Sequence, residues 1–299
     1  MREREKINMN NTTYKASDIV ILSEDDIRSY QMQVLDIARD VIAFFDDNNI
    51  EYSLSGGSIL GAVRHEGFIP WDDDIDINIP RASYDKMIEI FDDYLSDKYY
   101  IQTPQKYPEL GLLVVQIRKK GTIARRKYDW NLDECGVSID LYIIENVFDN
   151  VVKRMFQKNI SMALSFVVSS IRFCNNMCLP REIQELEGRQ FKYSKLKSIF
   201  GTIFKVIPLR KWIGWADYWY SACKDTSTRL VAIPTGRKHF SGEIYLREDM
   251  CVFRKANFEG EQFNIPIKAE KYLEYFYGDY MSIPPKEKRE KHIFLELKY

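Results

Sequence analysis

The first ordered pattern in the chain is a run of apolar residues at helical spacing behind a helix start signal. Ser23 is a favourable N-cap, and Asp26 stands three positions on, where a carboxylate suits a capping box and the helix dipole. Apolar residues then recur every three or four positions at Ile27, Tyr30, Val34, Leu35, Ala38, Val41, Ile42 and Phe45. The pattern predicts a long amphipathic helix that ends in the polar turn of residues 46–49.

Shorter alternating segments follow and predict strands. Residues 52–55 form a short strand before Gly56, Gly57 and Ser58, and residues 59–64 have helical character. Residues 74–79 (DIDINI) alternate strictly, which predicts a strand with one acidic edge. Pro80 suits the start of a further helix, with an apolar side made of Tyr84, Met87, Ile88, Phe91 and Leu95. Other strands are predicted at residues 112–118, 122–126 and 137–144.

A change of composition near residue 150 divides the chain. Residues 151–220 are helical in pattern, basic and aromatic, and the last third mixes a strand signal at 250–254 with a helix at 269–276. We therefore expect an α/β fold (an α+β mixed sheet) in three parts. These are a core of residues 20–150, a helical, basic and aromatic insertion of residues 151–230, and a C-terminal segment of residues 231–299 that completes the core.

Composition excludes several classes of protein. The 299 residues are 45% hydrophobic, enough for a large core, and 43 basic against 44 acidic residues give a net charge of −1. Without a broad basic field, no nucleic-acid partner is expected. Five cysteines without a CxxC pair argue against a disulfide framework or zinc knuckle. The N-terminus lacks a signal-peptide pattern, and the longest apolar run, residues 160–171, is shorter than the roughly 20 residues that cross a bilayer. A cytoplasmic protein is expected.

The chemistry is concentrated in residues 53–81. Gly56 and Gly57 let backbone amides approach a phosphate, and the helix start capped by Ser58 adds a partial positive charge. Asp74 and Asp76 are two apart, so on a strand their carboxylates share one face and repel unless a cation lies between them. Oxygen ligands of this kind suit Mg²⁺ or Mn²⁺. A plain tight turn and a solvated acidic loop are the alternatives, but the combination favours a metal–phosphate site.

The same segment, SGGSILGAVRHEGFIPWDDDIDI, resembles the signature of the LicD family, including Arg64, His65, Gly67, Pro70 and Trp71. The resemblance continues in residues 136–141 (GVSIDL) and in residues 277–292, with YGDYM, a Pro-Pro pair and a late His292. Residues 151–229 show little that matches.

The resemblance implies a nucleotidyltransferase-like fold in which Asp74 and Asp76 bind the metal and Asp140 is the third acid. Asp140 also stands out by itself as a lone carboxylate in an apolar strand, and an ion pair with a nearby Arg or Lys is the alternative explanation. Within the motif, Arg64 is expected to brace a phosphate. His65 would contact the leaving nucleotide or the acceptor hydroxyl. Asp72 and Asp73 are taken as supporting residues.

The implied activity is transfer of a phosphorylated alcohol, most typically phosphocholine from CDP-choline, onto a hydroxyl of a cell-surface glycan or teichoic-acid precursor. CMP would leave. Two rivals keep the same carboxylates: a nucleotidylyltransferase that releases pyrophosphate, and a non-catalytic binding protein on the same fold.

Residues 195–211 interleave basic with aliphatic and aromatic residues. Such a stretch suits peripheral contact with an anionic membrane on its inner face, as a lipid-linked acceptor would require, or a helix packed on the core. The aromatic cluster of residues 212–220 fits a core, an interfacial belt or a choline cage.

Overall fold

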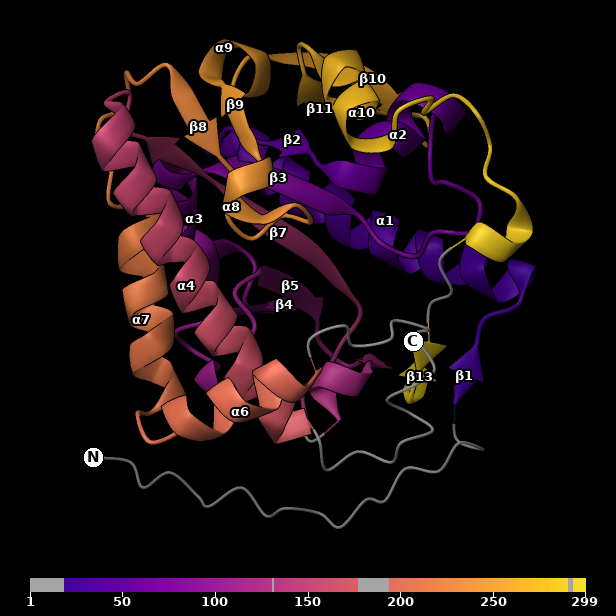
Figure 1. Ribbon diagram of the computed structural model, residues 1–299. Coiled ribbons are helices and arrows are strands. Elements are labelled where there is room, and N and C mark those ends of the chain that lie inside the picture. The colour runs from indigo at the N-terminus through magenta and orange to yellow at the C-terminus, as the bar shows by residue number, and fades with distance from the viewer. Residues whose placement is uncertain (1–18, 131, 177–193, 290–292) are drawn as a thin grey trace.

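A seven-stranded mixed sheet forms the centre of the protein (Figure 1). The computed structural model describes residues 19–130, 132–176, 194–289 and 293–299. The sheet has the order β2 (Ser53–Leu54), β3 (Asp76–Pro80), β7 (Ser138–Val147), β5 (Val115–Lys119), β4 (Tyr99–Gln102), with β8 (Leu230–Ala232) paired to β7 and β9 (Ile244–Leu246) paired to β8. β3 and β7 run parallel, and the other neighbours are antiparallel. The predicted mixed α/β fold is confirmed.

The first predicted helix is present as α1 (Glu24–Asp47), and it starts as expected. Ser23 Oγ accepts the Asp26 N–H at 3.2 Å while the Asp26 carboxylate accepts the Ser23 N–H at 3.3 Å. The apolar side is buried from Tyr30 to Phe45 and packs against the sheet. Helix α3 (Arg81–Tyr94) follows Pro80 as predicted and buries Tyr84, Met87 and Phe91, but Ile88 is exposed.

Two details around the acidic motif differ from the sequence prediction. β3 begins at Asp76, so Asp74 lies in the extended segment before the strand. Ile75, Ile77 and Ile79 are fully buried, as the alternation predicted. Helix α2 (Gly56–His65) has Ser55 and not Ser58 as its N-cap residue. The glycines therefore form the first turn of the helix instead of a loop before it.

The predicted helical region contains α4 (Val151–Asn176), α6 (Ser194–Phe204) and α7 (Leu209–Tyr220), which pack against one another at one side of the sheet (Figure 1). Val168 of α4 and Ile213 of α7 belong to a small buried cluster between these helices. A second cluster joins Ala216 of α7 to Val147 of β7 and to Phe240. The basic stretch 195–211 is split between α6 and α7 because Pro208 caps a new helix.

The C-terminal third returns to the central core. The hairpin of β10 (Phe253–Phe258) and β11 (Glu261–Pro266) and the helix α10 (Ala269–Tyr277) pack near α2 and β2. The predicted strand at 250–254 is wrong in its first half: α9 (Arg247–Met250) ends at Met250, residues 251 and 252 form a bend, and β10 starts at Phe253. The remaining elements are β1 (Val20–Ile21), β6 (Ile123–Arg125), α8 (His239–Gly242), β12 (Ile293–Phe294), β13 (Glu296–Lys298) and the 3-10 turns η2 (Pro108–Leu110), η3 (Lys127–Asp129) and η4 (Lys286–Lys288).

Pairs formed by these last strands tie the two ends of the chain together. β12 pairs with β1 and β13 pairs with β6, so the final residues lie beside elements from the first half. Among the helices that the structure describes, none is long and apolar enough to cross a membrane. Residues 1–18, Cys178 and His292 lie outside the described residues.

Candidate metal and phosphate site

The start of helix α2 lies directly against two carboxylates. Gly56 has a φ of +48°, a left-handed conformation that favours glycine. A Cβ at Gly56 would lie 3.3 Å from Asp76 Oδ2, and one at Gly57 would lie 3.0 Å from Asp72 Oδ2. The two glycines thus bring the positive end of the helix dipole into contact with acids.

Ser58 has a different role from the predicted cap. Its hydroxyl accepts the backbone N–H of Asp76 at 2.9 Å, and the Ser55 N–H donates to the Asp76 carbonyl at 2.8 Å. These bonds join the first turn of α2 to the first residue of β3. Because both the N–H and the carbonyl of Asp76 are hydrogen-bonded, the backbone that carries its carboxylate is held in place.

The register of two parallel strands places the third predicted acid beside the second. Asp76 on β3 pairs with Asp140 on β7, and the Asp140 N–H donates to the Ile75 carbonyl at 3.2 Å. Two residues 64 positions apart in the sequence therefore become lateral neighbours on one sheet face.

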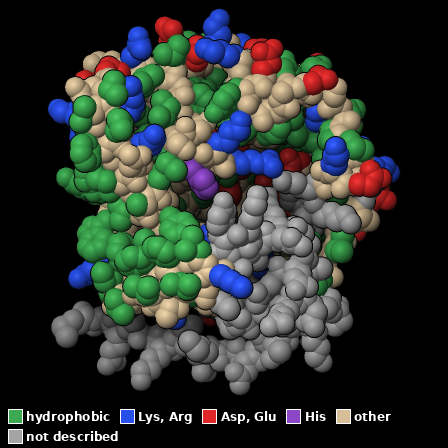
Figure 2. All heavy atoms as spheres, in the orientation of Figure 1, with side chains coloured by type: hydrophobic (Ala, Val, Ile, Leu, Met, Phe, Trp, Pro, Cys, Tyr) green, Lys and Arg blue, Asp and Glu red, His purple; other side chains and the backbone are tan. Residues whose placement is uncertain are grey.

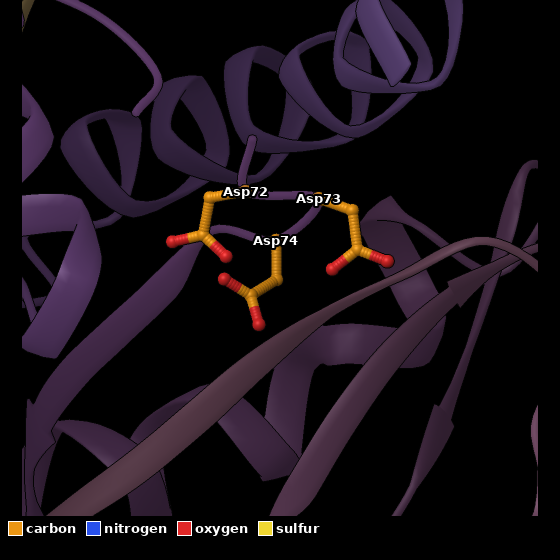
Figure 3. Close-up of side chains that lie close together, drawn as sticks. All are labelled: Asp72, Asp73 and Asp74. Carbon is orange, nitrogen blue, oxygen red and sulfur yellow. The ribbon is translucent and has the colours of Figure 1, made fainter. Parts of the chain in front are cut away.

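Asp72, Asp73 and Asp74 form the tightest acidic group of the part of the chain that the structure describes. One oxygen from each lies within 4.8 Å of the others. Figure 3 shows the Asp72 and Asp74 carboxylates turned toward one another, with Asp73 to one side. Asp73 is buried and pairs with Arg126 at 3.0 Å. Asp72, a supporting residue in the sequence prediction, thus lies close enough to Asp74 to join the predicted set of Asp74, Asp76 and Asp140.

The closeness and the burial of these acids change their pKa values. Burial first, and then the charges of Asp74, Asp140 and Asp72, raise the pKa of Asp76 well above its ordinary value. Burial also raises the pKa of Asp140. Carboxylates in this arrangement resist being ionised together without a compensating cation.

Asp140 is held by a buried polar chain that sequence reasoning missed. Gln116 Nε2 donates to Asp140 Oδ1 at 2.7 Å, and Gln116 Oε1 accepts from Arg118 Nη2 at 2.7 Å. Arg118 pairs with Asp129 at 3.1 Å, and both side chains are only 3% exposed. Further bonds run from Arg118 to Gln102 Oε1 and to the Gly136 carbonyl. The signal was available, because two polar residues two apart in an otherwise apolar strand share one face.

Asp74 and Asp140 border one cavity of about 150 Å³. Gln116, Ser138 and Arg126 lie in the same wall, and Leu112 and Val114 supply an apolar part. The cavity gives a small polar molecule access to the carboxylates.

The residues present fit a hard divalent cation. The donor set consists of carboxylate oxygens, which suit Mg²⁺ or Mn²⁺, and it lies against the glycines at the start of α2, where the helix dipole is positive. A phosphate entering this site without a cation would meet Asp72 and Asp76 directly. Because the carboxylates lie so close to the predicted phosphate-binding turn, a phosphate at that turn would need a cation between them.

Arg64 and His65 lie at the other end of α2. Arg64 Nη1 donates to the carbonyls of Tyr280 at 2.6 Å and Ser282 at 3.2 Å, and its Nε donates to His65 Nε2 at 2.9 Å. Burial and the Arg64 charge lower the pKa of His65, so the imidazole is neutral at pH 7. Arg64 thus holds the C-terminal segment, and its predicted contact with a phosphate stays a prediction.

Trp71 contributes a second anchor for the same segment. The Arg289 guanidinium lies 4.0 Å from the centre of the Trp71 ring, and the rings of Trp71 and His65 form a T-shaped pair with centroids 6.3 Å apart. These contacts give Trp71 a packing role.

Tyrosines of α10 also reach the site, which the sequence did not suggest. Burial raises the pKa of Tyr272, and the nearby backbone of Gly56 opposes part of that rise. Burial likewise raises the pKa of Tyr277, which lies within the electrostatic range of Arg237 and the acids Asp76, Asp72 and Asp74. No local pattern marks these tyrosines, because their contact depends on how α10 docks.

Comparison with known proteins agrees with the motif. Residues 49–177 match the family model described as LicD/FKTN/FKRP, nucleotidyltransferase domain. The match contains all of the predicted site residues.

Two kinds of relative are similar in sequence. The chain is 24% identical over 275 residues to the lipopolysaccharide cholinephosphotransferase LicD of Haemophilus influenzae. The aligned residues cover 89% of this chain and 95% of that protein. It is 48% identical over 42 residues to the human ribitol 5-phosphate transferase FKRP, but this covers 14% of the chain and 8% of that protein. The relative in the long match and the relative in the short match are both named as phospho-alcohol transferases. The resemblance to the LicD family seen in the sequence is confirmed.

Proposed function

We propose that the protein, whose residues 49–177 match the LicD/FKTN/FKRP nucleotidyltransferase domain model, transfers a phosphorylated alcohol from a CDP-alcohol to a hydroxyl of a glycan. The names of both kinds of relative support a phospho-alcohol transferase. The observation that carries the proposal is the β3–β7 register, which sets Asp76 beside Asp140 at the glycine turn.

Each acid has a role that its surroundings suit. Asp72, Asp74 and Asp76 lie at the start of α2 and would hold Mg²⁺ or Mn²⁺ against the donor diphosphate. When bound, the cation neutralises charge on the diphosphate and on the departing CMP. The amides of the α2 first turn would contact the same phosphates.

Asp140 is assigned to the acceptor. It borders the cavity, and Gln116 fixes its Oδ1, so the other oxygen is the one available for the acceptor hydroxyl. The acceptor oxygen forms a bond to the phosphorus that carries the alcohol, and the bond from that phosphorus to the oxygen of CMP breaks. The acceptor proton passes to Asp140, whose raised pKa suits a base that must pick up a proton.

The donor headgroup follows the long relative. Choline is the proposed alcohol, because the lipopolysaccharide cholinephosphotransferase matches almost the whole chain. Ribitol phosphate, named for the short relative, is the comparison substrate.

The test is a product assay. Protein with Mg²⁺, a CDP-alcohol and a glycan acceptor should release CMP, at a rate that requires the acceptor, and Asp140→Asn should abolish the release. If CTP and a phospho-alcohol yield pyrophosphate instead, the protein is a nucleotidylyltransferase. If the CDP-alcohols bind and raise the melting temperature without turnover of any acceptor, it is a binding protein.

A further inference from the structure

Large hydrophobic side chains are exposed on the helices α4, α6 and α7 and on the segment between α6 and α7. Figure 2 shows hydrophobic side chains gathered on the left of the view, over α4, α6 and α7. Val206 between α6 and α7 is 84% exposed, Tyr218 on α7 is 68% exposed, and Phe156 on α4 is 62% exposed. So much apolar surface in water is unfavourable unless something covers it.

The exposed residues follow the periodicity of the helices. Ile199 and Ile203 are four apart on α6, so they lie on one face and lead to Val206. Val152 and Phe156 are likewise four apart at the start of α4. The pattern is therefore a set of continuous apolar faces and not a scatter of single residues.

Packing among the three helices does not use these faces. Val168 and Ile171 of α4 pack with Trp212 and Ile213 of α7 in a buried cluster. The helices are thus already held together by their other sides. We call the outer surface, with Phe156, Ile199, Ile203, Val206 and Tyr218, the helical face.

Charge on the same helices is strongly one-sided. Residues 151–176 and 194–220 contain nine Lys or Arg and one acid, Asp217, although the whole chain has a net charge of −1. That acid is held by Arg81 of α3 at 2.8 Å. Lys195, Lys205 and Lys211 are exposed beside the apolar residues.

We propose that the helical face binds an anionic lipid surface. A second copy of the chain would bring two strongly basic faces together, which is unfavourable. Single-stranded nucleic acid would need aromatic rings for base stacking, whereas Val and Ile prevail here. Aliphatic residues that enter the headgroup region, with lysines around them, are typical of proteins that lie on anionic membranes. The basic stretch predicted at 195–211 is thus one part of a surface made by three helices.

The test is sedimentation of the whole protein with vesicles, without substrate. Vesicles of phosphatidylcholine mixed with phosphatidylglycerol should retain the protein at low salt, and pure phosphatidylcholine should retain much less. The triple variant Lys195→Gln, Lys205→Gln, Lys211→Gln should bind the mixed vesicles at least about tenfold more weakly.

A second variant tests the apolar part, and a third is its control. Ile203→Ser with Val206→Ser should weaken binding at every salt concentration, since it removes apolar contacts that salt does not screen. Val252→Ser changes an equally aliphatic residue that is 49% exposed outside these helices, and it should bind as the parent does.

Three results would overturn the proposal: no retention by mixed vesicles at low salt, equal retention of both helical variants and the parent, or concentration-dependent dimers that the Ile203 and Val206 changes abolish. Because no donor or acceptor is present, none of these results depends on the transfer activity.

Discussion

Replacing Arg118 by Met tests the buried chain that holds Asp140. Arg118 and Asp129 are each 3% exposed and 3.1 Å apart, so the substitution leaves a buried carboxylate without its cation. Breaking a buried ion pair from one side costs about 3–5 kcal/mol, because the remaining charge is uncompensated. For a chain of this size each kcal/mol lowers the melting temperature by roughly 2 °C.

A matched exposed arginine provides the control. Arg39 pairs with Glu261 at 2.8 Å and with Asp36 at 3.1 Å, but all three side chains are exposed. Since exposed ion pairs contribute about 0.2–1 kcal/mol, Arg39→Met should lose no more than that. Urea unfolding of the two variants gives both free energies of unfolding directly.

The double variant Arg118→Met, Asp129→Leu separates charge from packing. It should regain much of the lost stability, because removing both members of a buried pair is often close to neutral. Equal stability losses in Arg118→Met and Arg39→Met would refute the reasoning. So would a double variant that is less stable than Arg118→Met.

Activity gives an independent readout of the same chain. Gln116→Leu removes the donor to Asp140 Oδ1 and leaves the Arg118–Asp129 pair in place. Outer partners of catalytic or metal-binding groups contribute roughly 10–100-fold to activity, so kcat should fall by that factor with the fold intact. A Gln116→Leu variant as active as the parent would show that the chain is only structural.

Asp74→Asn and Asp76→Asn should each abolish transfer yet leave metal-free stability level or higher, because each removes charge from a crowded acidic site; a large fall in both melting temperatures would contradict this. Gly56→Ala should destabilise the fold by about 1–2 kcal/mol, since its φ is +48°, and a neutral effect in urea unfolding would refute the strain. Burial raises the pKa of Glu243 to about 7, so the parent protein should lose stability as the pH rises from about 4.5 through 7. The Glu243→Gln variant can still accept the Lys238 N–H but does not titrate, and its stability should not fall over that range. Parallel pH dependences for the two proteins would remove that assignment.

Local patterns decided much of the core. The Ser23–Asp26 capping box, the buried side of α1 and the alternation of Ile75, Ile77 and Ile79 all follow from residues within one or two turns of each other. The glycine turn and the acids after it could likewise be located from spacing, since their chemistry depends on neighbours in the sequence. The acids that the sequence named are brought together as expected, with the metal itself still a prediction.

Tertiary structure alone decided which partners these residues meet. Asp74 lies before β3 and not in it, Asp73 pairs with Arg126, and Gln116 supports Asp140. These outcomes depend on strand register, and register is set by how whole faces of the sheet bury.

The return of the C-terminal segment shows the same limit. The phosphate contact of Arg64 stays a prediction, and the sequence did not indicate that its guanidinium donates to the carbonyls of Tyr280 and Ser282, more than 200 positions away in the chain. Tyr272 reaches Gly56 across a similar separation. A sequence pattern reports a residue's periodicity and charge, whereas contacts between distant segments arise only when the packed core brings them together. The helical face depends on both sequence and tertiary structure. Its basic and apolar residues could be predicted from the sequence, whereas their exposure is decided by how the helices pack.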